Sequence, residues 1–167
     1  MRVAVLTISD ACAAGARQDL SGEAIVSWVA ALPGGQLAAR TVVPDESVEI
    51  VRVLLAWCDG DVADLVLTTG GTGLSPRDVT PEATRAVLER EAPGLGERIR
   101  GLSMGSFPRA ALARGLAGVR GRTLVVNLPG SPGGVRDALA ALDPIVAHAV
   151  QITRGAATDH SGVVPPS

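Results

Sequence analysis

The sequence contains no lysine and no tyrosine, and aromatic residues make up only 2% of its 167 residues, as one Phe and two Trp. Without lysine the chain cannot carry a Walker-type phosphate-binding loop or a Schiff-base nucleophile, because both need that amine. Phosphate groups would have to be bound by backbone N–H groups, arginine side chains or a metal ion. With so few aromatic residues, the hydrophobic core must be built from aliphatic side chains.

The chain also has no excess of positive charge and only two cysteines. The formal net charge is −2, so no basic field attracts nucleic acid or anionic membranes. The two cysteines, Cys12 and Cys58, lie far apart without metal-ligand spacing, and reduced thiols are typical of the cytoplasm. The apolar run at residues 1–6 is too short for a signal peptide, and no run approaches membrane-spanning length. We therefore expect a soluble cytoplasmic protein without nucleic-acid or membrane partners.

Short aliphatic segments alternate with helical patterns along most of the chain. This alternation is typical of an α/β fold in which a doubly wound, mostly parallel sheet lies between two layers of helices, a three-layer αβα arrangement. Segments on either side of Gly118 to Gly121 predict a late hairpin that adds one antiparallel strand. Strands are expected at residues 2–8, 36–43, 64–69, 111–116 and 122–127, and helices at 21–32 (capped by Ser21), about 47–58, 80–91, in broken form over 93–114, and on either side of Pro144.

No internal repeat or linker divides the chain, so we expect one domain over residues 1–154. The remaining residues, 155–167, are small, polar and rich in proline. Such a segment offers too little apolar surface to offset the entropy of ordering it. We expect a disordered tail there.

Three loops rich in glycine or serine follow predicted strands, at residues 9–22, 69–78 and 127–134. In doubly wound sheets, ligands bind outside the carboxyl ends of the strands. Each of these loops opens into a predicted helix N-terminus, where free N–H groups and the helix dipole favour anions. Three such loops at one edge of the sheet predict a phosphate-bearing ligand.

Acidic residues gather at the same edge: Asp10, Asp45, Glu46 and Asp78. Carboxylates beside a phosphate site indicate Mg²⁺, which takes one or two of them together with phosphate oxygens. The alternative is that Asp45 and Asp78 only cap turns or helix starts. Arg77 has the same two interpretations, either as a bidentate phosphate ligand or as a surface residue.

The glycine-rich run Gly70 to Gly73 has a structural explanation as well, a tight turn that needs positive φ. It lacks the spacing of the dinucleotide-binding fingerprint. The sequence shows no clear nucleophile and base for covalent catalysis, because His148 and His160 lie late in the chain and Ser131 is not in a nucleophile elbow. What remains is positioning and electrostatic stabilisation at phosphate, as in nucleotidyl transfer.

The segment from Thr68 to Glu82, TTGGTGLSPRDVTPE, resembles the signature of the molybdopterin adenylyltransferases. The resemblance covers about residues 3–150. Further motifs follow in the family's order: Ser9-Asp10 with Asp19 to Gly22, Val43 to Glu46, Pro93-Gly94, and Gly121 to Gly133. One departure is Ala113, which stands where relatives often have Ser.

The resemblance implies that ATP and molybdopterin, with Mg²⁺, are converted to adenylylated molybdopterin and pyrophosphate. It gives Asp45 and Asp78 the catalytic and metal-binding roles, and it implies a homotrimer that hands its product to a molybdate-inserting protein. Two alternatives stay open: a nucleotide pyrophosphate hydrolase of the competence-damage type, and a non-catalytic binding or scaffold domain. The residues that the resemblance assigns to nucleotide or pterin binding are Ser9, Asp10, Thr69, Gly70, Gly71, Thr72, Gly73, Arg77, Asn127, Pro129, Gly130 and Ser131.

Overall fold

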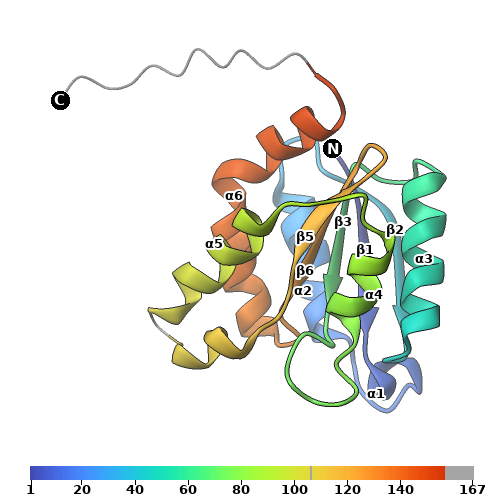
Figure 1. The fold of residues 1–167 in the computed structure, drawn as a ribbon, viewed down its shortest axis with the longest axis vertical. Coiled ribbons are helices and arrows are strands. Elements are labelled where there is room, and N and C mark those ends of the chain that lie inside the picture. The colour runs from blue at the N-terminus through green and yellow to red at the C-terminus, as the bar shows by residue number, and fades with distance from the viewer. Residues whose placement is uncertain (106, 157–167) are drawn as a thin grey trace.

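The computed structural model describes residues 1–105 and 107–156. A six-stranded sheet with the order β2-β1-β3-β6-β5-β4 forms the middle layer (Figure 1). All neighbouring strands from β2 to β6 pair in parallel, whereas β5 runs antiparallel to both of its neighbours. The predicted α/β fold with one antiparallel strand is therefore confirmed. The strands are β1 (Arg2–Ile8), β2 (Gln36–Val43), β3 (Leu65–Thr69), β4 (Arg90–Glu91), β5 (Ala117–Arg120) and β6 (Thr123–Leu128).

Helices cover both faces of the sheet. In Figure 1, α2, α5 and α6 lie on one side of it, and α3 and α4 lie on the other. No helix within the described ranges is both long and apolar enough to cross a membrane. The helices are α1 (Asp10–Ala13), α2 (Leu20–Ala31), α3 (Ser47–Asp59), α4 (Thr80–Val87), α5 (Pro93–Met104), the 3₁₀ helix η1 (Pro108–Leu112) and α6 (Pro132–Thr153).

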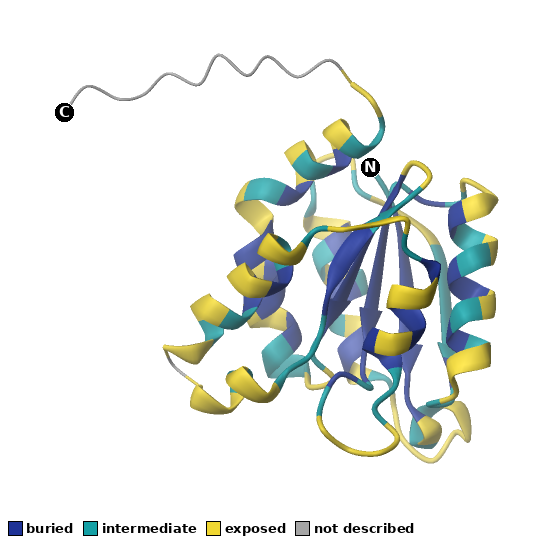
Figure 2. Ribbon diagram, in the orientation of Figure 1, coloured by how far each residue is buried: buried dark blue, intermediate teal, exposed yellow. Residues whose placement is uncertain are grey.

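The core is aliphatic, as the composition requires. Val3 and Val5 of β1 pack against α2 and α6, while Ala4 and Leu6 pack on the opposite face against α3. The inner strands are buried on both faces, and they stand out as a dark centre between helices with exposed outer sides (Figure 2). Two-sided burial explains why these strands read as continuous apolar runs instead of alternating patterns. No aromatic side chain is among the buried residues of the described chain.

The late hairpin forms, but the predicted bounds of its first strand and its turn were wrong. Gly118 lies inside β5, and the turn falls at Gly121, which has a φ of 55°. A Cβ on Gly118 would lie 2.4 Å from the backbone oxygen of Arg90. The glycine is therefore needed because β4 approaches closely, and it does not mark a turn. Residues 108–112, partly expected as strand, form η1 instead.

Three helix predictions also need correction. The helix α4 ends at Val87, and Arg90–Glu91 pairs with β5 as β4. The helix α6 continues through Pro144, because apolar residues on both sides of the proline bury one face against the sheet. The side chain that caps α2 belongs to Asp19, not to Ser21. The predicted tail at residues 155–167 lies outside the described residues except for Gly155 and Ala156.

The amino ends of β1 and β3 are joined by an ion pair. The Asp64 carboxylate accepts hydrogen bonds from the Arg2 backbone N–H (2.7 Å) and from its guanidinium Nη2 (2.8 Å). Burial acts to raise the pKa of Asp64, but the hydrogen bonds and charge of Arg2 outweigh it, so this pKa is lowered.

We predict that Asp64→Ala destabilises the fold at neutral pH and that the difference shrinks in acid. Because the folded-state pKa lies below its ordinary value, the carboxylate stabilises the fold above the unfolded pKa and loses this effect as pH falls through the folded pKa. Urea unfolding should show a loss of about 2 kcal/mol at pH 7, and this loss should shrink as the pH falls below about 4, the ordinary pKa of an aspartate. Glu97→Ala, at an exposed position on α5, is the control. An Asp64→Ala difference that is constant with pH would contradict this assignment.

Candidate active site

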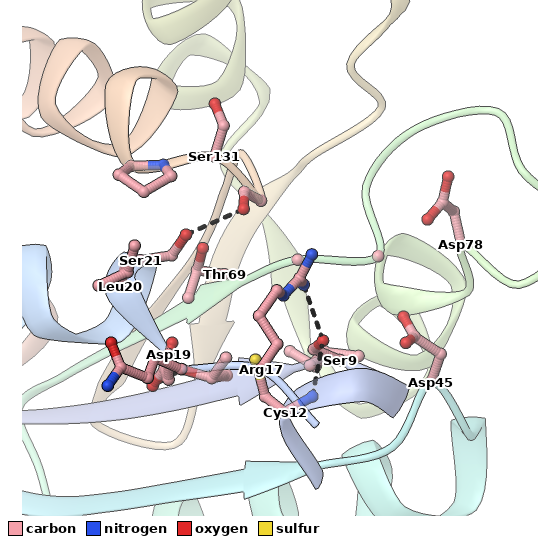
Figure 3. Close-up of a pocket in the computed structure, with 17 residues that line it drawn as sticks. Ser9, Cys12, Arg17, Asp19, Leu20, Ser21, Asp45, Thr69, Asp78 and Ser131 are labelled. Atoms are coloured by element: carbon pink, nitrogen blue, oxygen red, sulfur yellow. Dashed lines mark hydrogen bonds between the residues drawn. The ribbon is translucent and has the colours of Figure 1, made fainter. Parts of the chain in front are cut away.

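The order in which strands are added to the sheet reverses between β1 and β3. From β1 the chain continues to β2 on one side, whereas from β3 the sheet continues to β6 on the other side. Such a switch point leaves a crevice at the carboxyl ends of the two strands. A cavity of about 630 Å³ lies there, lined by residues that follow both strands, among them Ser9 and Gly70 (Figure 3). We call it the first cavity.

The glycine pair that directly follows β3, Gly70 and Gly71, lines this cavity. Gly70 and Gly71 have φ values of 99° and 61°. A Cβ on Gly70 would lie 2.1 Å from the backbone oxygen of Ile8, and one on Gly71 would lie 2.4 Å from Thr80 Oγ1 and 3.1 Å from Asp45 Oδ1. Both the conformation and the space therefore require glycine. The chain can leave β3 directly against the end of β1 only because these two side chains are absent.

Hydroxyl groups tie the three predicted loops together. Thr69 Oγ1 donates to the Pro129 carbonyl oxygen (2.6 Å), and Ser21 Oγ donates to that of Gly130 (2.9 Å). Thr80 Oγ1 donates to the Gly70 carbonyl oxygen (2.9 Å). The loops that were predicted to meet at one edge of the sheet do meet, and they are held by buried or partly buried hydrogen bonds.

Asp45 and Asp78 both line the first cavity. Asp45 Oδ2 accepts from the Asp10 backbone N–H (2.8 Å), and Asp78 Oδ2 accepts from that of Ser75 (2.8 Å). Each therefore caps a loop and also lines the cavity, so its capping hydrogen bond and its exposure to a ligand are compatible. Neither forms an ion pair with a described residue, whereas the neighbouring Asp10 and Glu46 both do. Burial raises the pKa of Asp45, and the nearby charges of Asp10 and Asp78 raise it further.

Arg77 is engaged by carboxylates. Its Nε and Nη2 donate to Asp10 (3.1 and 2.9 Å), and its Nη1 donates to Glu46 (2.8 Å). Asp10 in turn accepts from the Asp45 backbone N–H through Oδ1 (3.0 Å). The hydrogen bonds from Arg77, and then that from Asp45, lower the pKa of Asp10. Arg77 and Asp10 thus fix the backbone beside Asp45.

A second cavity of about 680 Å³ adjoins the first. Its lining includes the apolar side chains of Ile99 from α5, Leu112 from η1, and Phe107, which directly precedes η1. The two cavities share four residues, all of which were predicted as site residues: Gly71, Asp78, Gly130 and Ser131.

The remaining predicted residues fall into three groups. Ser9, Thr69 and Gly70 line only the first cavity, and Thr72, Gly73 and Pro129 line only the second. Asp10, Arg77 and Asn127 line neither. The Asn127 amide is buried, and its Nδ2 donates to the hydroxyls of Thr68 and Thr84, both at 2.9 Å.

Arg114 was not singled out as a site residue, yet it holds the glycine-rich loop. Its backbone N–H donates to Thr72 O (2.8 Å), its Nε donates to Gly73 O (2.7 Å), and its Nη2 donates to Asp78 O (2.6 Å). It also pairs with Glu82. No local pattern marks this arginine, because all its partners lie more than thirty residues away.

The residue types at the site fit a magnesium ion that arrives with a phosphate ligand. No group of three or more His, Cys, Asp or Glu side chains suited to a metal occurs in residues 1–105 and 107–156. Mg²⁺ commonly binds one or two carboxylates plus substrate phosphate oxygens, and Asp45 and Asp78 supply two. Burial, and after it the charges of Asp10 and Asp78, raise the pKa of Asp45, and a cation bound beside it would act against both effects.

Residues 4–148 match a family model described as a probable molybdopterin binding domain. The chain belongs to this family. It is 39% identical over 156 residues to the molybdopterin adenylyltransferase of Helicobacter pylori strain J99, covering 93% of this chain and 89% of the relative. Cinnamon, a molybdenum cofactor synthesis protein of Drosophila melanogaster, is 41% identical over 148 residues, 89% of this chain, which spans only 25% of that protein. The molybdopterin biosynthesis enzyme MoaB of Thermus thermophilus superimposes with a TM-score of 0.86 at 51% identity, with 92% of this chain and 96% of that one covered. The predicted family is thus confirmed.

We predict that Gly70→Ala disrupts this member of the molybdopterin-binding family far more than Gly15→Ala does. Both glycines have positive φ, but a Cβ at Gly15 meets nothing within 4 Å. Gly15→Ala should therefore cost only the conformational strain, about 1 kcal/mol. Gly70→Ala adds a backbone clash and should cost at least about 3 kcal/mol. Chemical denaturation of both variants measures this, and equal losses would contradict the packing role of Gly70.

Proposed function

We propose that this protein is a molybdopterin adenylyltransferase of molybdenum cofactor biosynthesis, with ATP and molybdopterin as its substrates. The observation that carries the proposal is the pair of adjoining cavities that share Gly71, Asp78, Gly130 and Ser131. Two substrates bound side by side would place their reacting phosphates at these shared residues. The names of the relatives, molybdopterin adenylyltransferases, support the same reaction.

The chemistry needs no nucleophile from the protein. An oxygen of the molybdopterin phosphate attacks the α-phosphorus of ATP, and the bond from that phosphorus to the oxygen bridging to the β-phosphorus breaks. Pyrophosphate leaves with the electron pair, and the pterin carries AMP. The protein contributes orientation and electrostatic stabilisation, the main terms in reactions at phosphate.

Asp45 and Asp78 would hold Mg²⁺ together with phosphate oxygens of the nucleotide. The ion supplies charge neutralisation at the phosphates. The backbone around Gly70 and Gly71 and the N-terminus of α6 at Ser131 would bind phosphate oxygens. We assign Asp10 and Arg77 to positioning Asp45, and Asn127 to joining β3, β6 and α4, in keeping with their contacts.

The hydrolase alternative and the scaffold alternative are not favoured, since the relatives carry the transferase name. The deciding experiment is mass spectrometry after incubation with Mg–ATP and molybdopterin. A transferase yields AMP attached to the pterin, a hydrolase yields free AMP, and a scaffold leaves ATP intact.

We predict that Asp45→Asn and Asp78→Asn each lower adenylyl transfer by about 100-fold or more, because the amide keeps size but removes the charge that the metal needs. Molybdopterin binding should persist, since backbone N–H groups hold its phosphate. Melting temperature should stay similar or rise for Asp45→Asn, because its raised pKa means that ionisation opposes folding as pH increases.

Glu46→Gln is the matched control, because Glu46 neighbours Asp45 but pairs with Arg77 and lines neither cavity. Turnover of the control should stay within about threefold of the wild type. Wild-type rates for both aspartate variants would refute their assigned roles, and loss of folding would leave them only a turn-capping role.

We further propose that the protein is a cytoplasmic homotrimer that passes its product to a molybdate-inserting protein. Val146 and Val150 of α6 are buried in the chain's own core, so they are not free to form the interface. Ile152 remains 49% exposed, and Leu102 of α5 and Leu112 of η1 are 58% and 53% exposed.

For the trimer, we predict a mass of three chains in light scattering at micromolar concentration. Exposed apolar side chains of this size favour association when they are covered by another copy. The measurement should be repeated with Leu102→Glu. A monomeric mass for the wild type would contradict the trimer.

A further inference from the structure

Arg17 is the only cationic side chain among the described residues that line the first cavity. It lies in the loop between α1 and α2 and was not among the predicted site residues. Its Nη2 donates to Ser9 Oγ (3.0 Å), and it forms no ion pair with a described residue. Most of its N–H groups are therefore available to a ligand.

The loop backbone holds Arg17 in place. The N–H groups of Ala16 and Arg17 both donate to the Ala11 carbonyl oxygen (2.8 and 3.2 Å), and that of Gly15 donates to Cys12 O (3.0 Å). The side chain then reaches Ser9, with Asp45 and Asp78 together on another side of the cavity (Figure 3). The guanidinium is thus positioned by a local turn and one hydroxyl.

The hydroxyl of Ser9 completes the arrangement. Ser9 Oγ accepts from the Cys12 backbone N–H (3.3 Å) and from Arg17. Its two lone pairs are used, and it donates to no described residue, so its proton can be offered to a ligand oxygen. Ser9 itself is buried, and the two hydrogen bonds that its oxygen accepts constrain the direction of this donor.

The charges around the cavity indicate what this pair binds. Asp19, the fourth charged residue of the lining, is matched by Arg40 at 2.9 Å. Arg17 stands unmatched, as do Asp45 and Asp78. A ligand that carries both a metal ion and excess negative charge would satisfy all three residues, and a magnesium-bound polyphosphate has this composition.

We propose that Arg17, with the Ser9 hydroxyl, binds a phosphate group of a substrate in the first cavity. This inference rests on the proposed function for the identity of the substrates. The group belongs either to the nucleotide, including the pyrophosphate that leaves, or to molybdopterin. Bound there, the planar guanidinium can donate two parallel hydrogen bonds to phosphate oxygens.

The test uses three variants of the full chain. Arg17→Gln removes the charge, Arg17→Lys keeps the charge without the fork, and Arg136→Gln is the control, because Arg136 is exposed on α6 and lines neither cavity. Calorimetric titrations with Mg–ATP, inorganic pyrophosphate and molybdopterin, each alone, separate the possible sources of the phosphate.

Arg17→Gln should lower the binding affinity for at least one of these ligands about tenfold or more. The affinity of Arg17→Lys should fall between those of Arg17→Gln and the wild type, and the affinity of the control should match the wild type. If affinity falls for Mg–ATP and pyrophosphate, Arg17 binds a phosphate of the nucleotide. If affinity falls for molybdopterin alone, Arg17 binds the pterin phosphate. The melting temperature should not change.

Unchanged affinity for all three ligands would overturn the proposal. So would a fall in melting temperature shared by both Arg17 variants, because that result assigns a structural role. The titrations need no turnover, so a wild type that binds these ligands without forming adenylylated pterin would refute the proposed function and not the role of Arg17.

Discussion

The close contact between the turn at Gly70 and the carbonyl group of Ile8 sets the geometry of the whole site. Parallel pairing of β1 and β3 brings these two strand ends together, and a Cβ on Gly70 would lie only 2.1 Å from the Ile8 oxygen. With glycine there, the chain turns across the end of β1 and carries Asp78 to the same cavity as Asp45. The meeting of two carboxylates from distant segments is thus a consequence of backbone packing at the switch point.

Polar side chains then hold the loops in that arrangement. The hydroxyls of Thr69, Ser21 and Thr80 bond to backbone carbonyls of the neighbouring loops. Arg114 bonds the carbonyl groups of Gly73 and Asp78. Each such hydrogen bond contributes only about 1 kcal/mol net to folding. Their larger effect is to hold the loops, and with them the loop backbone N–H donors, in place before a substrate arrives. Donors fixed in advance are how a site stabilises charge that develops during a reaction.

Charge is distributed unevenly around this edge of the sheet. Asp10 and Asp19 have arginine partners, Arg77 and Arg40, which lower their pKa values. Asp45 has none, and its pKa is raised. The carboxylate left without a cation is one that faces the cavity. An aspartate held in this way costs folding stability, and a bound cation offsets that cost.

The sequence alone determined the layered architecture, the aliphatic core and the segments that form the site. These follow from local composition: continuous apolar runs form strands buried on both faces, and glycine or aspartate at strand ends forms turns. Only the tertiary structure decided where the turn of the late hairpin falls, because Gly118 is required by the close approach of β4 and does not mark the turn. It alone also decided that Arg114 holds the loop, that Arg77 binds carboxylates, and that Arg17 faces the first cavity. The residues that the side chains of Arg114 and Arg77 contact lie more than thirty residues away, so no local pattern specifies these contacts.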